Sequence, residues 1–254
     1  SSNTAIATVN ATSGVVTGVA AGTATLTYTV AGTGGCSNAT ATRTVTVYTC
    51  PTIAALSPSA DRVCAGVNVT LTAAGLTGMS SLSSGIIFKY STSALADPYV
   101  GGTTIATIAN ANLEASGAIA RTTTSFAAGG TYYIYAILST TPDGTGCRPY
   151  ATTTVVVNPN GQVTLPANSV VCSGTSIAAQ TLTTTNSGGT TTYAWTNSAT
   201  SIGLAASGST ATIPAFTATN TGSAGVTATI AVTPTYTDGG VSCAGAASSY
   251  TITV

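Results

Sequence analysis

The chain closes on Cys243-Ala-Gly-Ala-Ala-Ser-Ser-Tyr-Thr-Ile-Thr-Val254, and two earlier stretches have the same form. They are Cys36-Ser-Asn-Ala-Thr-Ala-Thr-Arg-Thr-Val-Thr-Val47 and Cys147-Arg-Pro-Tyr-Ala-Thr-Thr-Thr-Val-Val-Val157. In each copy a Gly or Ser precedes the cysteine, small polar residues follow it, and apolar residues then mix with threonine up to a final valine. Repetition on this scale indicates a string of β-modules, each ended by the same kind of strand.

The composition predicts an all-β protein whose surface carries hydroxyl and amide groups rather than charges. Only 4% of the residues are charged, against about 25% in ordinary globular proteins, while 44% are hydrophobic. The hydrophobic content argues against disorder. The net charge of zero offers no attraction to nucleic acid or to an anionic membrane. No apolar run reaches the roughly 18 residues of a membrane span, and no signal peptide begins at Ser1, so we expect a mature or excised segment.

Strand-type alternation recurs along the whole chain. Apolar residues alternate with threonine over 23–30 and 44–47, and these two strands should pair as a hairpin. Val69, Leu71 and Ala73 share one face of a later strand, and residues 132–138 are apolar on both faces, which predicts a central strand. We expect further strands at the sequence positions 86–90, 152–157, 177–184, 192–196, 226–233 and 250–254.

The repeat and the turn chemistry divide the chain into three parts. Residues 1–49 contain too few strands to bury both faces of a sandwich. Residues 50–158 and 159–254 each have the roughly 100 residues of an immunoglobulin-like sandwich. We expect a turn at Asp143-Gly-Thr-Gly, a linker at Asn158-Pro-Asn-Gly161, and a buried Trp195 on the third strand of the last part.

Six cysteines without any histidine indicate disulfides rather than a zinc site. Cys64 and Cys172 stand just before an early strand of their parts, and Cys147 and Cys243 just before the closing strands. The pattern therefore predicts the bonds Cys64–Cys147 and Cys172–Cys243, and with them an oxidising, extracellular location. A closed loop of that length contributes at most about 4–5 kcal/mol in the chain-entropy model.

The two remaining cysteines, Cys36 and Cys50, flank one strand. A strand of that length spans roughly 30 Å, whereas a disulfide requires Cα atoms within about 7 Å. A bond between these two cysteines within one chain is therefore disfavoured. Cys36 and Cys50 are expected to be free thiols, to bond another chain, or to bond residues outside this sequence.

Two stretches resemble known families. The run Ser2-Asn-Thr-Ala-Ile-Ala-Thr-Val-Asn-Ala-Thr-Ser-Gly-Val-Val-Thr-Gly-Val-Ala-Ala-Gly-Thr-Ala-Thr-Leu-Thr-Tyr28 resembles the second half of a group 2 bacterial immunoglobulin-like domain. Four further runs resemble the PKD-like modules of large secreted proteins of Bacteroidetes-type bacteria: Tyr193-Ala-Trp-Thr-Asn197, Ile202-Gly-Leu-Ala-Ala-Ser-Gly208, Ile213-Pro-Ala-Phe-Thr-Ala-Thr-Asn220 and Val232-Thr-Pro-Thr-Tyr236. The resemblance implies that 1–49 is a partial module without its first strands, that 50–158 is a more divergent Ig-like repeat, and that 159–254 is PKD-like. It also implies a cell-surface adhesin, stalk or filament.

The residues offer little for catalysis. With no histidine, Ser-His-Asp and Cys-His arrangements cannot form. Lys89, the only lysine, is expected to face solvent from mid-strand, and the carboxylates are dispersed and mostly in turns: Asp61, Asp97, Glu114, Asp143 and Asp238. Neither a glycosidase pair nor a calcium loop is indicated. We therefore expect no catalytic residue, no cofactor and no metal.

The first interpretation is a non-enzymatic structural segment of an extracellular surface protein, forming a stalk or filament. The gap in 1–49 would be filled by β-strands from a neighbouring subunit or from adjoining sequence of the same polypeptide, because an exposed sheet edge recruits strands. Two alternatives stay open. One is an adhesin module that binds a surface glycan, for which Tyr132, Tyr133 and Tyr135 could form a stacking face if they were not buried in a central strand. The other is an accessory region of a larger secreted enzyme.

Overall fold

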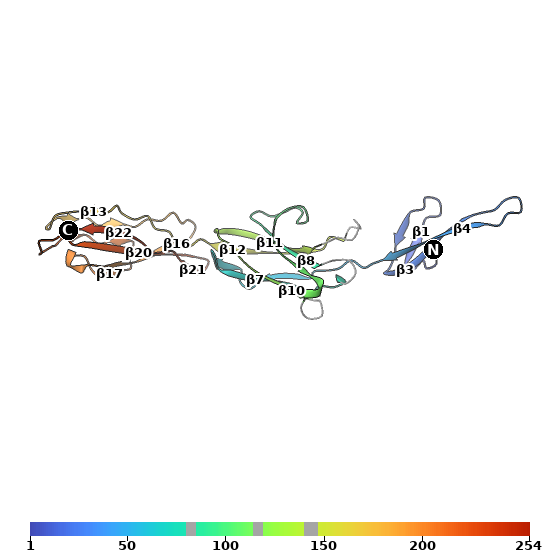
Figure 1. Ribbon diagram of the computed structural model, residues 1–254, viewed down its shortest axis with the longest axis horizontal. Coiled ribbons are helices and arrows are strands. Elements are labelled where there is room, and N and C mark those ends of the chain that lie inside the picture. The colour runs from blue at the N-terminus through green and yellow to red at the C-terminus, as the bar shows by residue number, and fades with distance from the viewer. Residues whose placement is uncertain (80–84, 114–118, 140–146) are drawn as a thin grey trace.

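The computed structural model describes residues 1–79, 85–113, 119–139 and 147–254, and strands make up nearly all of its regular structure. The predicted all-β class is confirmed. Figure 1 shows three groups of strands in a row, and within the described residues every sheet takes its strands from a single group. We call residues 1–49 module 1, residues 50–158 module 2 and residues 159–254 module 3.

Module 1 consists of two hairpins. Strand β1 (Ala7–Val9) pairs with β2 (Val16–Gly18), and β3 (Gly22–Val30) pairs with β4 (Ala39–Val47) in the antiparallel register that runs from Gly22 opposite Val47 to Val30 opposite Ala39. The predicted hairpin is therefore confirmed. Ala7 and Ala24 are the only hydrophobic residues of module 1 that are buried, so this module has almost no core of its own.

Module 2 is a sandwich of two sheets with the strand orders β10-β7-β5 and β6-β12-β11-β8-β9. The alternating residues Val69, Leu71 and Ala73 are fully buried, as predicted, and pack with Ile86 and Phe88 of the facing sheet. Its strands are β5 (Ala55–Pro58), β6 (Arg62–Cys64), β7 (Asn68–Ala74), β8 (Gly85–Ser91), β9 (Thr103–Ala109), β10 (Ile119–Ser125), β11 (Gly130–Leu138) and β12 (Tyr150–Asn158), with a 3-10 helix η1 at Asn110–Asn112. The turn expected at 143–146 lies outside the described residues.

Module 3 repeats this arrangement with a more broken second sheet. Its large sheet has the order β13-β22-β20-β16-β17, with β21 paired to β20, and the opposite side is made of the short pairs β14–β19 and β15–β18. The strand predicted over 177–184 is divided into β14 and β15. The elements are β13 (Ser169–Val170), β14 (Ser176–Ile177), β15 (Gln180–Thr181), β16 (Thr190–Asn197), β17 (Ser207–Gly208), β18 (Thr212–Ile213), β19 (Phe216–Thr217), β20 (Thr227–Asp238), β21 (Val241–Ala244) and β22 (Ser248–Thr253), with η2 at Thr200–Ile202.

The strand order identifies modules 2 and 3 as immunoglobulin-like sandwiches. In each, the closing strand (β12 or β22) lies between an antiparallel neighbour and a short parallel strand from the start of the module. Tyr132, near the start of β11, donates its hydroxyl to the carbonyl of Ala128 at 3.0 Å, which matches the tyrosine corner of such folds. Trp195 is buried on β16, as predicted, and β11 is a central strand, as its double apolar pattern indicated.

Trp195 packs over a position where no side chain fits. Gly208 lies opposite Trp195 in the β16–β17 ladder, and a Cβ built on Gly208 would stand 2.5 Å from indole atom Cζ2. The indole is 3% exposed, and its Nε1 is buried without a hydrogen-bond partner. The close ring-to-backbone packing therefore depends on glycine.

We predict that Gly208→Ala destabilises module 3 by about 1–3 kcal/mol, because the added methyl displaces a buried ring from a close-packed core. Urea unfolding followed by the fluorescence of the single tryptophan measures the loss. Gly225→Ala is the matched control, since a Cβ there meets its nearest neighbour, Thr253, at an ordinary 3.7 Å. Equal midpoints for the two variants would contradict this view of the Trp195 site.

Candidate functional site

The carboxylates do not gather into a site of catalytic type. Asp97 pairs with Arg148 at 2.8 Å and Asp238 pairs with Arg62 at 2.6 Å, so these two acids serve separate ion pairs. Glu114 and Asp143 lie outside the described residues. Among the residues that are described, no three His, Cys, Asp or Glu side chains come together as metal ligands would, and no helix is long and apolar enough to cross a membrane. The absence of enzymatic activity stays a prediction.

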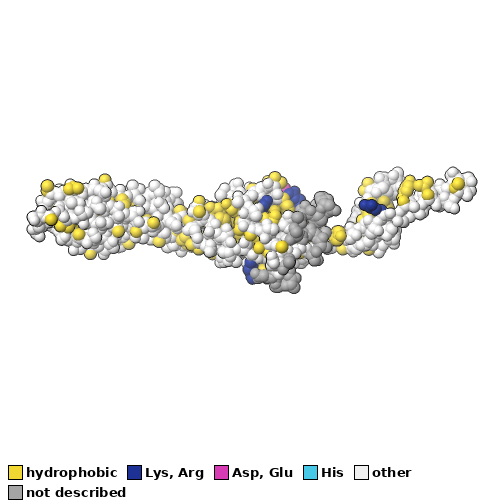
Figure 2. All heavy atoms as spheres, in the orientation of Figure 1, with side chains coloured by type: hydrophobic (Ala, Val, Ile, Leu, Met, Phe, Trp, Pro, Cys, Tyr) yellow, Lys and Arg dark blue, Asp and Glu magenta, His cyan; other side chains and the backbone are white. Residues whose placement is uncertain are grey.

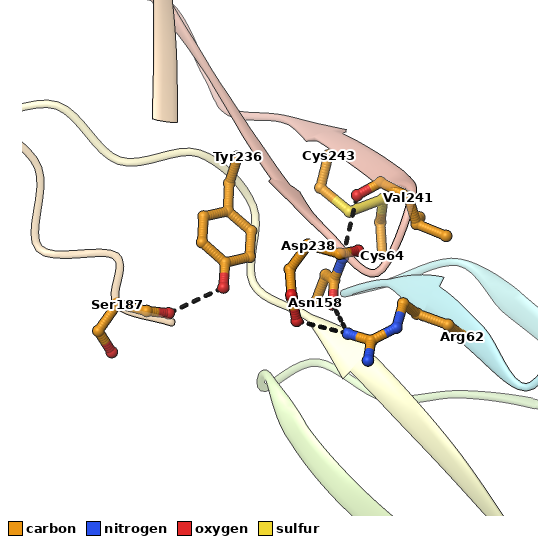
Figure 3. Close-up of polar contacts among 8 residues, drawn as sticks. All are labelled: Arg62, Cys64, Asn158, Ser187, Tyr236, Asp238, Val241 and Cys243. Carbon is orange, nitrogen blue, oxygen red and sulfur yellow. Dashed lines mark hydrogen bonds and ion pairs between the residues drawn. A yellow bond between two sulfur atoms is a disulfide. The ribbon is translucent and has the colours of Figure 1, made fainter. Parts of the chain in front are cut away.

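The most connected polar cluster lies where module 2 meets module 3 (Figure 3). Arg62, on β6, donates from Nη1 to the carboxylate of Asp238 at 2.6 Å and to the side-chain oxygen of Asn158 at 2.7 Å. Asn158 ends β12 and is 1% exposed. Its amide nitrogen donates to the carbonyls of Asp238 at 2.8 Å and Val241 at 3.0 Å. Asn158 thus uses both side-chain N–H groups across the junction, while its side-chain oxygen holds Arg62 of its own module.

The hairpin β20–β21 supplies the module 3 side of this junction. Its turn contains Gly239 and Gly240, both at positive φ, as a two-residue hairpin turn requires. Tyr236 is 3% exposed and donates its hydroxyl to the carbonyl of Ser187 at 2.8 Å, which fixes the end of β20. Because Arg62 and Asp238 keep 28% and 38% of their side-chain surface exposed, their ion pair contributes about 1 kcal/mol or less.

A disulfide between Cys64 and Cys243 crosses the same junction, with Cα atoms 5.5 Å apart. The second disulfide joins Cys50 to Cys147, with Cα atoms 5.4 Å apart. The predicted bonds Cys64–Cys147 and Cys172–Cys243 are therefore wrong. Cys64 lies beside Asn158 at the end of β12, whereas Cys147 precedes its start, and a strand of this length separates them by roughly 30 Å.

The predictions for Cys36, Cys50 and Cys172 differ in outcome. Cys36 is free and exposed, and it does not bond Cys50, in agreement with the strand-length argument. Cys50 was expected to be a free thiol or to bond another chain. This prediction is wrong, because Cys50 bonds Cys147 of the same chain. Cys172, expected in a disulfide, is instead a free and exposed thiol. The pairing of Cys243 was wrong because its partner lies in another module, and the pairing of Cys147 was wrong because its partner is Cys50, in the linker that opens module 2.

A second polar cluster holds the segment that carries Cys147. Arg148 pairs with Asp97 and lies 4.6 Å from the ring centroid of Tyr99, whose hydroxyl donates to the carbonyl of Pro149 at 2.9 Å. Burial raises the pKa of the Tyr99 phenol above its usual value, and the nearby Arg148 opposes that rise. These contacts position Cys147, which is 7% exposed, for its bond to Cys50 in the linker that follows β4.

Module 1 exposes the apolar surface that a complete sandwich would bury. Figure 2 shows hydrophobic side chains along the hairpin at this end of the molecule. Six of its large hydrophobic residues are 40–71% exposed: Val15, Val16, Val19, Tyr28, Val30 and Tyr48. A groove of about 720 Å³ lies between the 9–14 loop and the β3–β4 hairpin, lined by Leu26 and Tyr28 on one strand and by Ala41 and Arg43 on the other.

Both outer edges of the β3–β4 sheet lack a paired strand within the described residues. The backbone of Thr25 shows which groups point outward, because its N–H and carbonyl bond Ser2 rather than β4. In an antiparallel pair, the backbone N–H and C=O groups of every second residue point away from the partner strand. The residue directly opposite on that partner strand also points its groups outward. The N–H groups of Thr27 on β3, and of Thr42 and Thr44 on β4, therefore face outward.

The tyrosines of β11 do not form a stacking face for sugars. Tyr132 and Tyr135 are 7% and 3% exposed, and Tyr132 stacks on Phe126 with ring centroids 4.1 Å apart. Lys89, expected to face solvent, is half-buried, and its ammonium donates to the carbonyls of Pro98 at 3.0 Å and Gly101 at 2.8 Å. Lys89 thus holds the loop between β8 and β9 against the sheet, a role that the strand pattern alone did not reveal.

No protein-family model and no curated protein matches this sequence. Solved structures that resemble it include fibronectin(III)-like modules of Clostridium thermocellum CbhA, at 20% identity over 78% of this chain and 93% of that one, with a TM-score of 0.27. The human OSCAR ligand-binding domain is similar at 17% identity over 82% and 100%, with a TM-score of 0.27. The Ig1-2 module of Drosophila DLAR follows at 14% identity over 81% and 100%, also with a TM-score of 0.27. At these scores the fold assignment rests on the strand order described above.

We predict that digestion without reduction yields the linked peptide pairs Cys50–Cys147 and Cys64–Cys243, with Cys36 and Cys172 open to alkylation. Trypsin cuts after Arg43 and Arg62, and chymotrypsin cuts after tyrosines that separate the last three cysteines, so mass spectrometry resolves each pair. Linked peptides joining Cys64 to Cys147, or Cys172 to Cys243, would contradict the junction described here.

We predict that Gly239→Ala weakens the junction more than Gly240→Ala. Both substitutions place alanine at positive φ, but only at Gly239 does the new Cβ collide with Arg62, which Asp238 and Asn158 hold in place. In a glutathione redox buffer, the Cys64–Cys243 bond of Gly239→Ala should be reduced at severalfold lower glutathione than that of Gly240→Ala, since about 1 kcal/mol corresponds to a factor of about five. Identical reduction curves would show that Arg62 contributes nothing to the junction.

Proposed function

We propose that this chain is a non-enzymatic structural segment of an extracellular surface protein, which builds a stalk or filament from tandem Ig-like modules. In the assembled state, strands from a neighbouring subunit complete module 1. The observation that carries this proposal is the state of module 1, where two alanines are buried while six large hydrophobic side chains are exposed. Burial of such side chains stabilises by about 1.5–3 kcal/mol each, so the open module gains strongly from a partner.

The complete modules indicate how incoming strands would pair. The closing strands β12 and β22 each have a parallel strand, β6 or β13, on their outer side. The strands before them in sequence, β11 and β20, each have an antiparallel neighbour, β8 or β16. In module 1, β4 corresponds to the closing strands and β3 to the strands before them. The outer edge of β4 would therefore pair with a parallel strand and the outer edge of β3 with an antiparallel one. Strand addition of this kind uses backbone hydrogen bonds for affinity.

Two features support an extracellular setting. Disulfides persist in oxidising compartments, and this chain forms two that join distant segments. The surface is nearly free of charge and rich in threonine and serine hydroxyls, and Figure 2 shows charged side chains only at isolated places on the visible face. A low net charge weakens the repulsion between copies, which favours association.

We predict that Thr42→Pro blocks assembly and that Thr42→Val does not. Proline removes an N–H that points away from β3, so the hairpin keeps its own ladder while the incoming strand loses a donor and meets the pyrrolidine ring. Valine keeps the N–H and suits a strand. Sedimentation velocity and negative-stain microscopy of the full chain should show oligomers for wild type and Thr42→Val, and at least about tenfold weaker association for Thr42→Pro.

Two results would overturn the proposal. The first is a wild-type chain that remains monomeric at all concentrations while module 1 stays open. The second is a Thr42→Pro variant that assembles as readily as Thr42→Val, because pairing at the β4 edge would then play no part.

A further inference from the structure

The two disulfides obey one rule of position. In each, a cysteine that lies close to the end of one closing strand bonds a cysteine that leads into the next closing strand along the chain. Cys50 follows β4 of module 1 and bonds Cys147, which precedes β12 of module 2. Cys64 lies beside Asn158 at the end of β12 and bonds Cys243, which precedes β22 of module 3. Each boundary between modules thus has one such bond beside it: Cys50–Cys147 ties the linker after β4 to module 2, and Cys64–Cys243 ties module 2 to module 3.

The strand register places Cys172 in the role of Cys64. In module 2, Arg62 pairs with Val156 of the closing strand, and Cys64 comes two residues after Arg62. In module 3, Val170 pairs with Thr253 of the closing strand in the same parallel sense, and Cys172 comes two residues after Val170. Since Val156 and Thr253 both stand one residue before the valine that ends the repeat, the two cysteines occupy equivalent positions.

Cys36 occupies the position that corresponds to Cys147 and Cys243. It lies in the loop between β3 and β4 and leads into the closing strand of module 1, as Cys147 and Cys243 lead into theirs. Both Cys36 and Cys172 are free and exposed. In Figure 1 the β3–β4 loop extends at one end of the row, and β13, which Cys172 follows, lies in the group at the other end.

We propose that Cys172 of one copy of this chain forms a disulfide with Cys36 of a second copy, which repeats the internal junctions head to tail. This inference rests on the proposed function and names the covalent contact of that assembly. Because one chain has both halves of the junction on opposite ends, the contact is heterologous and can propagate as a filament. The two thiols lose two protons and two electrons to a disulfide oxidant, which is reduced to two thiols while the new S–S bond forms.

The residues around the free thiols favour an apolar contact in place of the ion pair. The position equivalent to Arg62 holds Val170, which is 82% exposed. Ala31 precedes Cys36 by the same interval as Asp238 precedes Cys243, and its neighbour Val30 is 51% exposed. Val170 and Ala31 thus stand where Arg62 and Asp238 form the ion pair between modules 2 and 3. Because both charges are replaced by apolar residues, a contact between two copies would bury no unpaired charge.

The test uses the full chain and its Cys36→Ser and Cys172→Ser variants, each incubated with oxidised and reduced glutathione and run on non-reducing gels. We expect a ladder of multimers for wild type, and monomers for either variant alone. An equimolar mixture of the two variants should give a dimer and nothing larger, because each supplies one half of the junction. Mass spectrometry of the dimer should identify a linked peptide pair that contains Cys36 and Cys172.

Several outcomes would overturn the inference. Homodimers of each variant as abundant as the mixed dimer would show unselective oxidation, and a wild-type chain whose two thiols stay open to alkylation would show that copies do not bond. The Cys36→Ser/Cys172→Ser double variant separates this inference from the proposed function. If it assembles without covalent bonds and wild type forms no Cys36–Cys172 link, strand completion holds and the disulfide inference alone fails.

Discussion

The arrangement of modules 2 and 3 depends on the Cys64–Cys243 bond and the buried amide beside it. Arg62 and Asp238 are too exposed for their ion pair to hold two modules together by itself. The disulfide closes a loop with a sequence separation of 179 residues, which stabilises the folded state by about 5 kcal/mol in the chain-entropy model. Asn158, at 1% exposure, then sets the orientation through two hydrogen bonds to the carbonyls of Asp238 and Val241, because any rotation of module 3 would leave its buried amide N–H groups unpaired.

The sequence pattern predicted the elements well wherever burial alone determines them. The alternation of Val69, Leu71 and Ala73, the double-sided apolar run of β11 and the single Trp195 each led to the correct placement. The predicted disulfide pairing was wrong because the alternation of apolar residues indicates only which face of a strand is buried. It does not indicate at which end of a module a loop lies, and the end decides which cysteines can meet. The Arg62–Asp238 contact joins residues 176 positions apart, and no local pattern signals it.

Module 1 shows what happens when the closing hairpin lacks the rest of its sandwich. The β3–β4 ladder pairs the backbone groups between its two strands, yet Tyr28 and Val30 stay exposed on it because no second sheet of the described residues packs against them. The sequence predicted this shortage of strands, and it left open whether another chain, adjoining sequence or a free thiol accounts for Cys36. The repetition of one junction type along the row favours another copy, since the free thiols are the two halves of a further junction.

Electron cryo-microscopy of the oxidised, assembled full chain tests this account most directly. Successive copies should join end to end in filaments, with density that connects Cys172 of one copy to Cys36 of the next. An added antiparallel strand should lie beside β3 and an added parallel strand beside β4. Isolated rods whose first module remains open, or filaments in which the two cysteines lie far apart and the edges of β3 and β4 stay unpaired, would contradict it.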